Sequence, residues 1–136
     1  MNKFSIVFDT NVLVSALLSP SGNPAKIYRM FLMGAVEVLF HEDILMEYED
    51  VLFRPHLRIA QEDARSVIQA IRRVGKKADT VTSVVEMPDE DDRIFYDVAT
   101  QSGAFLITGN IKHFPQKPSI LTPTEFLNLV NDIWLQ

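Results

Sequence analysis

The sequence contains no cysteine and no long apolar run. Without cysteine, the chain cannot form disulfides or thiolate zinc sites, and it has no thiol nucleophile. No segment approaches the ~20 apolar residues that a membrane span needs, and the run after Lys3 is too short for a signal peptide. These absences predict a cytoplasmic protein with no membrane anchor.

Basic charge is also scarce, since 13 Lys and Arg residues stand against 18 Asp and Glu residues, for a formal net charge of −5. This balance argues against a protein that holds nucleic acid through a general basic surface. The acidic residues cluster at 89–92, whereas the dense basic group is Arg72, Arg73, Lys76 and Lys77. An acidic site that needs cations, with a separate basic face, explains this distribution, and so do two solvated surface patches.

The remaining composition is that of an ordinary globular protein, with 47% hydrophobic and 23% charged residues. A chain of 136 residues is long enough for one domain, here expected over 1–136, and such a domain buries roughly two-thirds of its unfolded surface. No internal repeat or low-complexity segment divides it.

The stretch from Ser5 to Asn11 predicts the centre of the fold. Ile6, Val7 and Phe8 have no polar residue among them, as expected of a strand that is buried on both faces of a parallel sheet. Asp9 follows at the point where this strand stops, at the edge where open α/β sheets hold their ligands. We therefore expect Asp9 to lie in a ligand-binding crevice.

Helical and strand patterns alternate along the rest of the chain. The sequence predicts helices over 12–18, 24–33, 42–54, 61–74 and 90–102, with Asn23 as the N-cap of the second. Strands are predicted over 36–40, 104–108 and 119–121, and 80–85 is either an edge strand or an extended connection. A final helix begins at Thr122, Pro123 and Glu125, the pattern of a capping box. The alternation implies an α/β fold, with helices on both faces of a parallel sheet.

Polar side chains occur at four places where such a sheet presents its carboxyl edge: Asp9 after the first strand, Glu47 on a helix, Asp89 to Asp92 at a helix start, and Asn110 after a later strand. Carboxylates that converge on one crevice repel each other unless a cation lies between them. Oxygen ligands without His or Cys suit Mg²⁺ or Mn²⁺. Metal-assisted hydrolysis of a phosphodiester is the reaction that uses such a site.

These residues also have purely structural explanations. Asp9 is a good N-cap for the helix that follows it, and Asp89 could cap the later helix with Asp92 as its N3 partner. Glu49 flanks the opposite side of the same apolar stripe as Glu47, so the helical period does not choose between them. Position in the sequence leaves both kinds of explanation open.

Taken together, the motifs resemble the PIN domain family (PilT N-terminus), and within it the VapC-like toxin nucleases. The matching segments are IVFDTN at 6–11, ILMEY at 44–48 with VL at 51–52 and RP at 54–55, DEDDRIF at 89–95 with Ala99, LITGN at 106–110 with HFP at 113–115, and TPTEFL at 122–127. Each segment alone is a weak signal, but five in this order cover nearly the whole chain.

The resemblance implies a three-layer α/β/α sandwich around a central parallel sheet of four to five strands. It implies Mg²⁺- or Mn²⁺-dependent cleavage of RNA, a small antitoxin protein as partner, and a homodimer. The residues implied for the site are carboxylates that hold the metal and residues that support the cofactor: Asp9, Glu47 and Asp92 in the first group, and Asn11, Asp89 and Thr108 in the second.

The chain departs from the commoner family pattern at Asn110, which stands where an aspartate is often found, two residues after the threonine. On its own, Asn110 after a glycine is an ordinary turn residue. As a catalytic residue, its neutral amide can still ligate a cation or hold the water of that cation, but it supplies no charge. Three carboxylates remain, and whether the site holds a second metal stays open.

Two other functional classes fit parts of the sequence. A catalytically silent PIN domain that binds RNA or protein is favoured by Asn110, although the three carboxylates speak against it. A phosphatase of the haloacid dehalogenase type needs an aspartate where Asn11 stands. A receiver domain needs an acidic pair at the end of its first strand, where Asp9 stands alone.

Overall fold

The computed structural model describes residues 3–134, and within them a five-stranded sheet forms the centre of the molecule. Its strands are β1 (Phe4–Phe8), β2 (Val36–Phe40), β3 (Lys76–Lys77), β4 (Phe105–Ile107) and β5 (Ile120–Leu121). They lie in the order β3-β2-β1-β4-β5, and every neighbouring pair is parallel. The first strand therefore lies in the middle of the sheet, as the sequence predicts.

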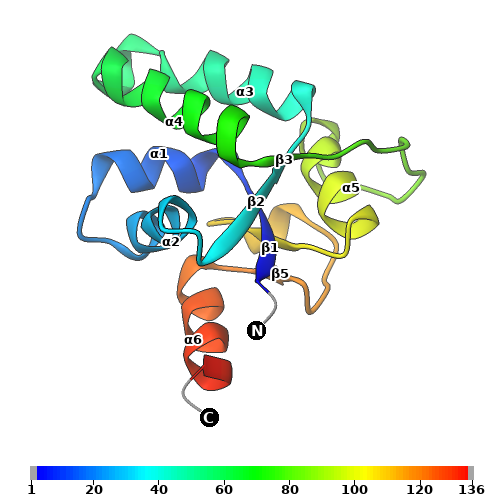
Figure 1. The fold of residues 1–136 in the computed structure, drawn as a ribbon. Helices are drawn as coiled ribbons and strands as arrows, with labels where there is room; N and C mark the ends of the chain where they lie inside the picture. The colour runs from blue at the N-terminus through cyan, green and yellow to red at the C-terminus, as the bar shows by residue number, and fades with distance from the viewer. Residues whose placement is uncertain (1–2, 135–136) are drawn as a thin grey trace.

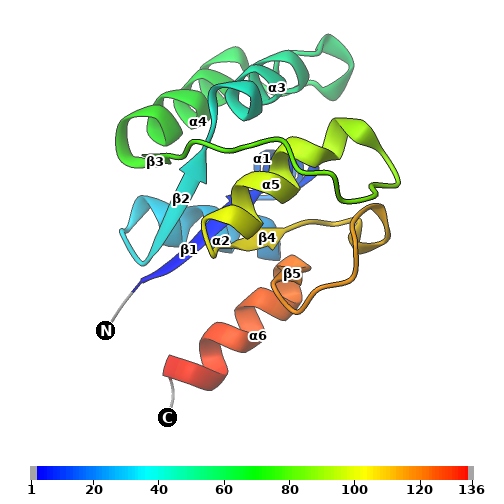
Figure 2. The same cartoon turned by 90° about the vertical axis from the view of Figure 1, so that its right-hand side faces the viewer.

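Within residues 3–134, six α-helices surround this sheet: α1 (Thr10–Leu18), α2 (Asn23–Leu32), α3 (Glu42–Leu52), α4 (Gln61–Val74), α5 (Arg93–Gln101) and α6 (Pro123–Trp134). Figure 1 shows α1 and α2 on one side of the sheet and α5 on the other, and Figure 2 shows α6 beside β5. The predicted three-layer α/β/α fold is thus confirmed. None of the helices in this part of the chain combines the length and the apolar character that crossing a membrane requires.

Three short 3₁₀ turns complete the described chain: η1 (Pro55–Leu57), η2 (Glu90–Asp92) and η3 (Ile111–His113). η1 follows α3, η2 leads into α5, and η3 follows β4. Residues of all three line the cavity at the carboxyl edge of the sheet. They matter for function because each of the three contributes side chains or caps to the candidate site described below.

Residues 80–85 form no strand. The edge of the sheet next to β2 is formed by the two-residue β3, which pairs with the end of β2. The reason is a side chain on α5. Gln101 accepts hydrogen bonds from the Thr80 hydroxyl at 2.8 Å and from the Val81 amide at 2.9 Å, and it donates to the Val81 carbonyl. The backbone N–H and C=O of Val81 are therefore bonded to a helix side chain rather than to a sheet partner. The extended connection, one of the two sequence alternatives, is what the chain adopts.

Helix ends differ from their predictions by a few residues. Gly22, not Asn23, is the N-cap of α2; Asn23 is the first residue of the helix, and its Nδ2 donates to Thr124 Oγ1 of α6 at 2.9 Å. The third helix ends at Leu52, two residues before the position that precedes Pro55, where a helical conformation is disfavoured. The predicted helix over 90–102 is split into η2 and α5.

The start of α6 agrees with its prediction. Thr122 Oγ1 accepts a hydrogen bond from the Glu125 amide at 3.1 Å, and Glu125 Oε1 accepts one from the Thr122 amide at 2.9 Å. These two reciprocal bonds are the capping box that the sequence indicates.

Candidate active site

Asp9 is the first residue after β1, at the carboxyl edge of the sheet, and it caps α1. Its Oδ1 accepts a hydrogen bond from the Thr10 amide at 2.8 Å, and its Oδ2 accepts one from Thr108 Oγ1 at 2.7 Å. The residue is only 7% exposed. Capping does not compete with a role in a site, because each carboxylate oxygen has two lone pairs and these bonds use one on each.

Thr108 reaches Asp9 because β4 pairs directly with β1. The side chain is fully buried, and its hydroxyl also accepts a hydrogen bond from the Asn110 amide at 2.9 Å. Asn11 joins the same two segments, since its Oδ1 accepts a hydrogen bond from the Gly109 amide at 3.3 Å. These bonds hold the loop after β4 against the start of α1.

Glu47 comes to the site from α3. Its neighbour Tyr48 is fully buried and donates its hydroxyl to the carbonyl of Phe8, which anchors α3 to the end of β1. Glu47 is partly buried, and its Oε2 accepts a hydrogen bond from the Thr10 hydroxyl. Glu49 is exposed to solvent. Of the two glutamates between which the helical period could not choose, Glu47 is the one that faces Asp9 and the start of α1.

Asp92 ends η2, immediately before α5. Its Oδ2 is buried without a hydrogen-bond partner in the part of the chain that the structure describes, and it lies 3.7 Å from His113 Nδ1. Asp89 is exposed and caps η2 by accepting a hydrogen bond from the Asp91 amide at 3.0 Å. The structural explanation therefore holds for Asp89, whereas Asp92 makes no side-chain cap hydrogen bond.

The elements around Asp9 form a cavity of about 320 Å³. Four residues of the sequence-predicted site line it: Asp9, Asn11, Asp92 and Asn110. Two more lie one hydrogen bond behind the lining: Thr108 behind Asp9, and Glu47 behind Thr10. Asp89 is not part of the lining. The rest of the wall consists of Thr10, Val14, Val51, Arg54, His56, Leu57 and His113.

Three residues with nitrogen-bearing side chains line this cavity without having been predicted as site residues: Arg54, His56 and His113. Arg54 comes from the connection between α3 and η1, His56 comes from η1, and His113 comes from η3. The sequence held a signal for Arg54 and His113, since both belong to segments that match the family pattern, RP at 54–55 and HFP at 113–115. Without that resemblance, the sequence presents His113 as a loop residue.

Burial raises the pKa of all three carboxylates. For Asp9 this effect exceeds the lowering of its pKa by hydrogen bonds from two threonines. Burial likewise raises the pKa of Glu47, opposed by the hydrogen bond from Thr10 and reinforced by the charge of Asp9. Burial, with the charges of Asp9 and Asp89, raises the pKa of Asp92 to about 6. The charges of His113 and Arg54 lower these pKa values, but by less than burial raises them.

The donor set fits a hard divalent cation in its chemistry. Carboxylate oxygens are the ligands that Mg²⁺ and Mn²⁺ prefer, and Asp92 Oδ2 is a buried oxygen with no partner. With the side chains as they stand, no three Asp, Glu or His residues within 3–134 form a metal-binding group. Asp9 and Asp92 line the cavity itself, whereas Glu47 is held beside it by the Thr10 hydroxyl.

The fold is that of a PIN domain, and sequence comparison agrees: a family profile described as "PIN domain" matches residues 5–112. The chain belongs to the PIN domain family. PIN domains are generally nucleases that use divalent metals, so the chain is a PIN superfamily nuclease in its broad class, with RNA as the ligand that the family implies.

A curated relative shares much of the chain. It is the uncharacterized protein MJ1680 of the archaeon Methanocaldococcus jannaschii, which is 32% identical over 111 residues. The aligned region covers 79% of this chain and 72% of the relative. The name of this relative specifies neither a family nor a substrate.

Proposed function

We propose that the protein is a Mg²⁺- or Mn²⁺-dependent endoribonuclease that hydrolyses phosphodiester bonds of RNA. The observation that carries this proposal is the placement of three buried or partly buried carboxylates at one cavity, with Asp9 and Asp92 in its wall and Glu47 behind Thr10. Uncompensated carboxylates at the carboxyl edge of a parallel sheet are stabilised best by a bound cation. The family supports a nuclease reaction, and these three residues are the proposed metal ligands for it.

The proposed roles of these residues are to hold the metal and to orient the groups that hold it. Asp9, Glu47 and Asp92 would hold the metal, and a bound divalent ion supplies an activated water and stabilises the charge that develops on the phosphate. Thr108 orients Asp9 through its 2.7 Å hydrogen bond, as Thr10 orients Glu47.

Three further residues support the site in this proposal. Asn110 offers a neutral amide at the cavity rim, where it can hold a water molecule or an outer ligand. Asn11 keeps the loop after β4 in place through its bond to the Gly109 amide. Asp89 lies outside the lining and acts through its negative charge, which helps to raise the pKa of Asp92 and so its demand for a cation.

We further propose that the protein is the toxin component of a toxin–antitoxin pair and forms a homodimer. The support is the resemblance to VapC-like toxins, together with the net charge of −5, which suits an antitoxin with a basic tail that enters the acidic cavity. Coexpression with the product of the adjacent reading frame should give a stable complex in which RNA cleavage is suppressed. A neighbouring product that neither binds nor inhibits the protein would contradict the toxin role.

The nuclease proposal is tested by incubating the purified protein with RNA in Mn²⁺, Mg²⁺ or EDTA, with a generic phosphomonoester in parallel. We expect internal cleavage of RNA in the presence of either metal, none in EDTA, and no release of phosphate from the monoester. Hydrolysis of the monoester alone would indicate a phosphatase. RNA that is bound but not cleaved at any metal concentration would favour the silent binding module to which Asn110 points.

A further inference from the structure

One part of the cavity wall carries positive charge close to the carboxylates. Arg54 lines the same cavity as Asp9 and Asp92, and so does His56, which lies two residues later in η1. The charge of Arg54 also acts on Glu47, whose pKa it lowers slightly against the larger effect of burial. A polyanion that enters this acidic cavity therefore meets a guanidinium group at its wall.

We propose that Arg54 binds a phosphate of the RNA backbone and so positions the strand over the carboxylates. This inference rests on the nuclease function proposed above and names the residue by which that site would hold its substrate. An arginine is the suitable side chain, because its planar guanidinium presents paired N–H donors to two phosphate oxygens. A chain with a net charge of −5 needs such a contact, since its general field repels RNA.

The guanidinium of Arg54 is free to change partners. Its contact within the described chain is one hydrogen bond from Nη2 to Asp50 Oδ2 at 2.8 Å, and the two side chains are 49% and 69% exposed. An exposed pair of this kind stabilises the fold little. Within residues 3–134, Nη1 and Nε have no hydrogen-bond partner, so their three N–H groups and the second N–H of Nη2 remain for a ligand.

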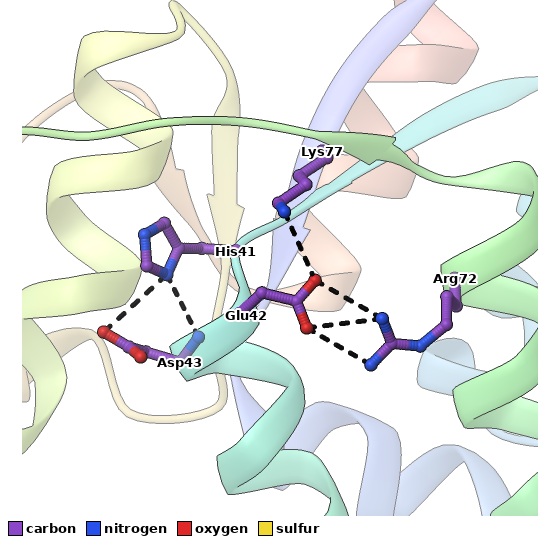
Figure 3. Close-up of polar contacts among 5 residues, drawn as sticks. All are labelled: His41, Glu42, Asp43, Arg72 and Lys77. Atoms are coloured by element: carbon purple, nitrogen blue, oxygen red, sulfur yellow. Dashed lines mark hydrogen bonds and ion pairs between the residues drawn. The ribbon is translucent and has the colours of Figure 1, made fainter.

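Arg72 shows the opposite state at almost the same exposure, 51%. Its Nη1 and Nη2 donate three hydrogen bonds to the two oxygens of Glu42, at 3.2 to 3.3 Å, as Figure 3 shows. Lys77 Nζ contacts the same carboxylate at 3.6 Å. The fork of Arg72 is thus occupied by a carboxylate, whereas most of the fork of Arg54 is not.

The backbone of Arg54 is fixed even though its side chain is exposed. It is the N-cap of η1, its amide donates to the Val51 carbonyl at 3.1 Å, and Pro55 follows with a restricted φ. Val51 lines the same cavity and anchors this turn to α3. The Cα position of Arg54 is therefore set by the fold, and only the side chain needs to move to take a phosphate.

The test compares Arg54→Ala with Arg72→Ala, two arginines matched in exposure and in having a carboxylate partner. Equilibrium binding of a labelled single-stranded RNA is measured in EDTA, where metal-dependent cleavage is blocked, at several salt concentrations. We expect Arg54→Ala to weaken binding about tenfold, as for loss of a charged hydrogen bond, and Arg72→Ala to bind like the parent. The slope of log K against log salt should fall in magnitude by about 0.7 for Arg54→Ala, the loss of one phosphate contact.

Two further variants and a kinetic measurement complete the test. Arg54→Lys should keep the salt slope of the parent because it keeps the charge, and Asp50→Asn should bind RNA at least as tightly as the parent. In Mn²⁺, Arg54→Ala should raise KM for RNA cleavage about tenfold and leave kcat within about twofold, since it removes binding common to ground and transition states. Thermal unfolding of every variant checks that the fold is intact.

Several outcomes overturn the inference. These are equal losses for Arg54→Ala and Arg72→Ala, unchanged RNA affinity for Arg54→Ala, a parent that does not bind RNA, and a loss confined to kcat. Failure of the nuclease proposal is distinguishable from these results. RNA that the parent binds through Arg54 but never cleaves in any metal would leave the phosphate contact standing and remove the proposed reaction.

Discussion

Glu42 and Asp92 are carboxylates of the same molecule with opposite surroundings. Glu42, which comes after β2, is partly buried, and hydrogen bonds from Arg72 with the charge of Lys77 lower its pKa (Figure 3). Asp92, which lines the cavity with Asp9, has a buried oxygen without a hydrogen-bond partner in the described chain, and burial with the charges of Asp9 and Asp89 raises its pKa to about 6. Arg72 and Lys77 neutralise Glu42, whereas the group that faces Asp92 is the imidazole of His113, 3.7 Å away.

The difference teaches that acidic residues alone do not define a site. Glu42 and Glu47 lie on the same helix, and both accept hydrogen bonds from neighbouring elements. The donor to Glu42 is an arginine, whereas the donor to Glu47 is the uncharged hydroxyl of Thr10. A hydroxyl orients a carboxylate without neutralising it, so the negative charge at Glu47 remains available to a cation.

The largest effect is expected for Asp9→Asn. Nuclease activity should fall by more than about a hundredfold, because the variant removes a ligand from the centre of the proposed metal site. Stability in EDTA should equal or exceed that of the parent, since the substitution relieves repulsion and asparagine is also a good N-cap. Cleavage assays and thermal unfolding measure the two quantities, with Asp79→Asn as an exposed control. Cleavage at the parent's rate by Asp9→Asn would remove Asp9 from the site.

Glu47→Gln and Glu49→Gln form a matched pair on α3. We expect Glu47→Gln to lose activity about tenfold to a hundredfold, because it removes a charge beside the cavity. Glu49 is exposed, so Glu49→Gln should keep the activity of the parent and stay within ~0.5 kcal/mol of it in free energy of unfolding. RNA cleavage and denaturant unfolding of both variants provide the comparison. Equal losses of activity would show that orientation on the helix does not determine the role.

Asn110→Asp should sharpen the contrast by adding a third carboxylate to the cavity wall, beside Asp9 and Asp92. If Asn110 belongs to the ligand shell, half-maximal cleavage should move to a Mn²⁺ concentration about threefold to tenfold lower, because a carboxylate offsets more of the cation's charge than an amide does. A metal titration of parent and variant side by side gives the answer. An unchanged titration curve places Asn110 outside that shell, and two proteins inactive at every concentration favour the binding module.

The smallest effect concerns how the free energy of unfolding depends on pH in EDTA. The contributions of Asp92 and Glu42 to it should change with pH in opposite directions. The pKa of Asp92 is raised from 3.8 to about 6. Its contribution to the free energy of unfolding is therefore complete below pH 3.8 and is lost as the pH rises through about 6. Asp92→Asn should reduce this loss by about 1 kcal/mol, a figure discounted for partial exposure of the side chain.

Glu42 is the control for this pH measurement, because its pKa is lowered rather than raised. Its contribution is present above its ordinary pKa of 4.5 and is lost as pH falls through the lower folded value. Glu42→Gln should therefore change the free energy of unfolding without altering its course between pH 5 and pH 7, followed by denaturant unfolding in steps of pH. A pH profile of Asp92→Asn identical to that of the parent would contradict the picture of a carboxylate lacking positive charge.

Local sequence patterns determined most of the fold. The apolar run from Ile6 to Phe8 indicated a central strand, and the capping box at Thr122 and Glu125 gave the start of α6, because the groups that stabilise these features lie within a few residues of each other. Helix ends were less certain. Asn23 has the right chemistry for an N-cap, yet its amide is used by Thr124, a residue of the last helix.

The carboxylates of the candidate site could be named from the sequence, but their surroundings could not. Asp9 is predictable because a strand end fixes its place, whereas its hydrogen bond from Thr108 depends on β4 pairing beside β1. The choice of Glu47 over Glu49 and the appearance of Arg54 in the cavity depend on how α3 packs. Asp89, which the sequence placed with the cofactor, lies outside the lining because η2 separates it from Asp92.

By itself, then, the sequence determined the order of strands and helices along the chain, the family, and which carboxylates follow a strand or begin a helix. Tertiary structure alone decided which of those carboxylates would be neutralised. Arg72 and Lys77 reach Glu42 from α4 and β3, whereas the group that faces Asp92 in the described chain is the imidazole of His113, whose Nδ1 lies 3.7 Å from Asp92 Oδ2. The physical reason is that secondary structure depends on contacts between near neighbours in the chain, whereas the charge state of a side chain depends on burial and on partners brought from distant segments.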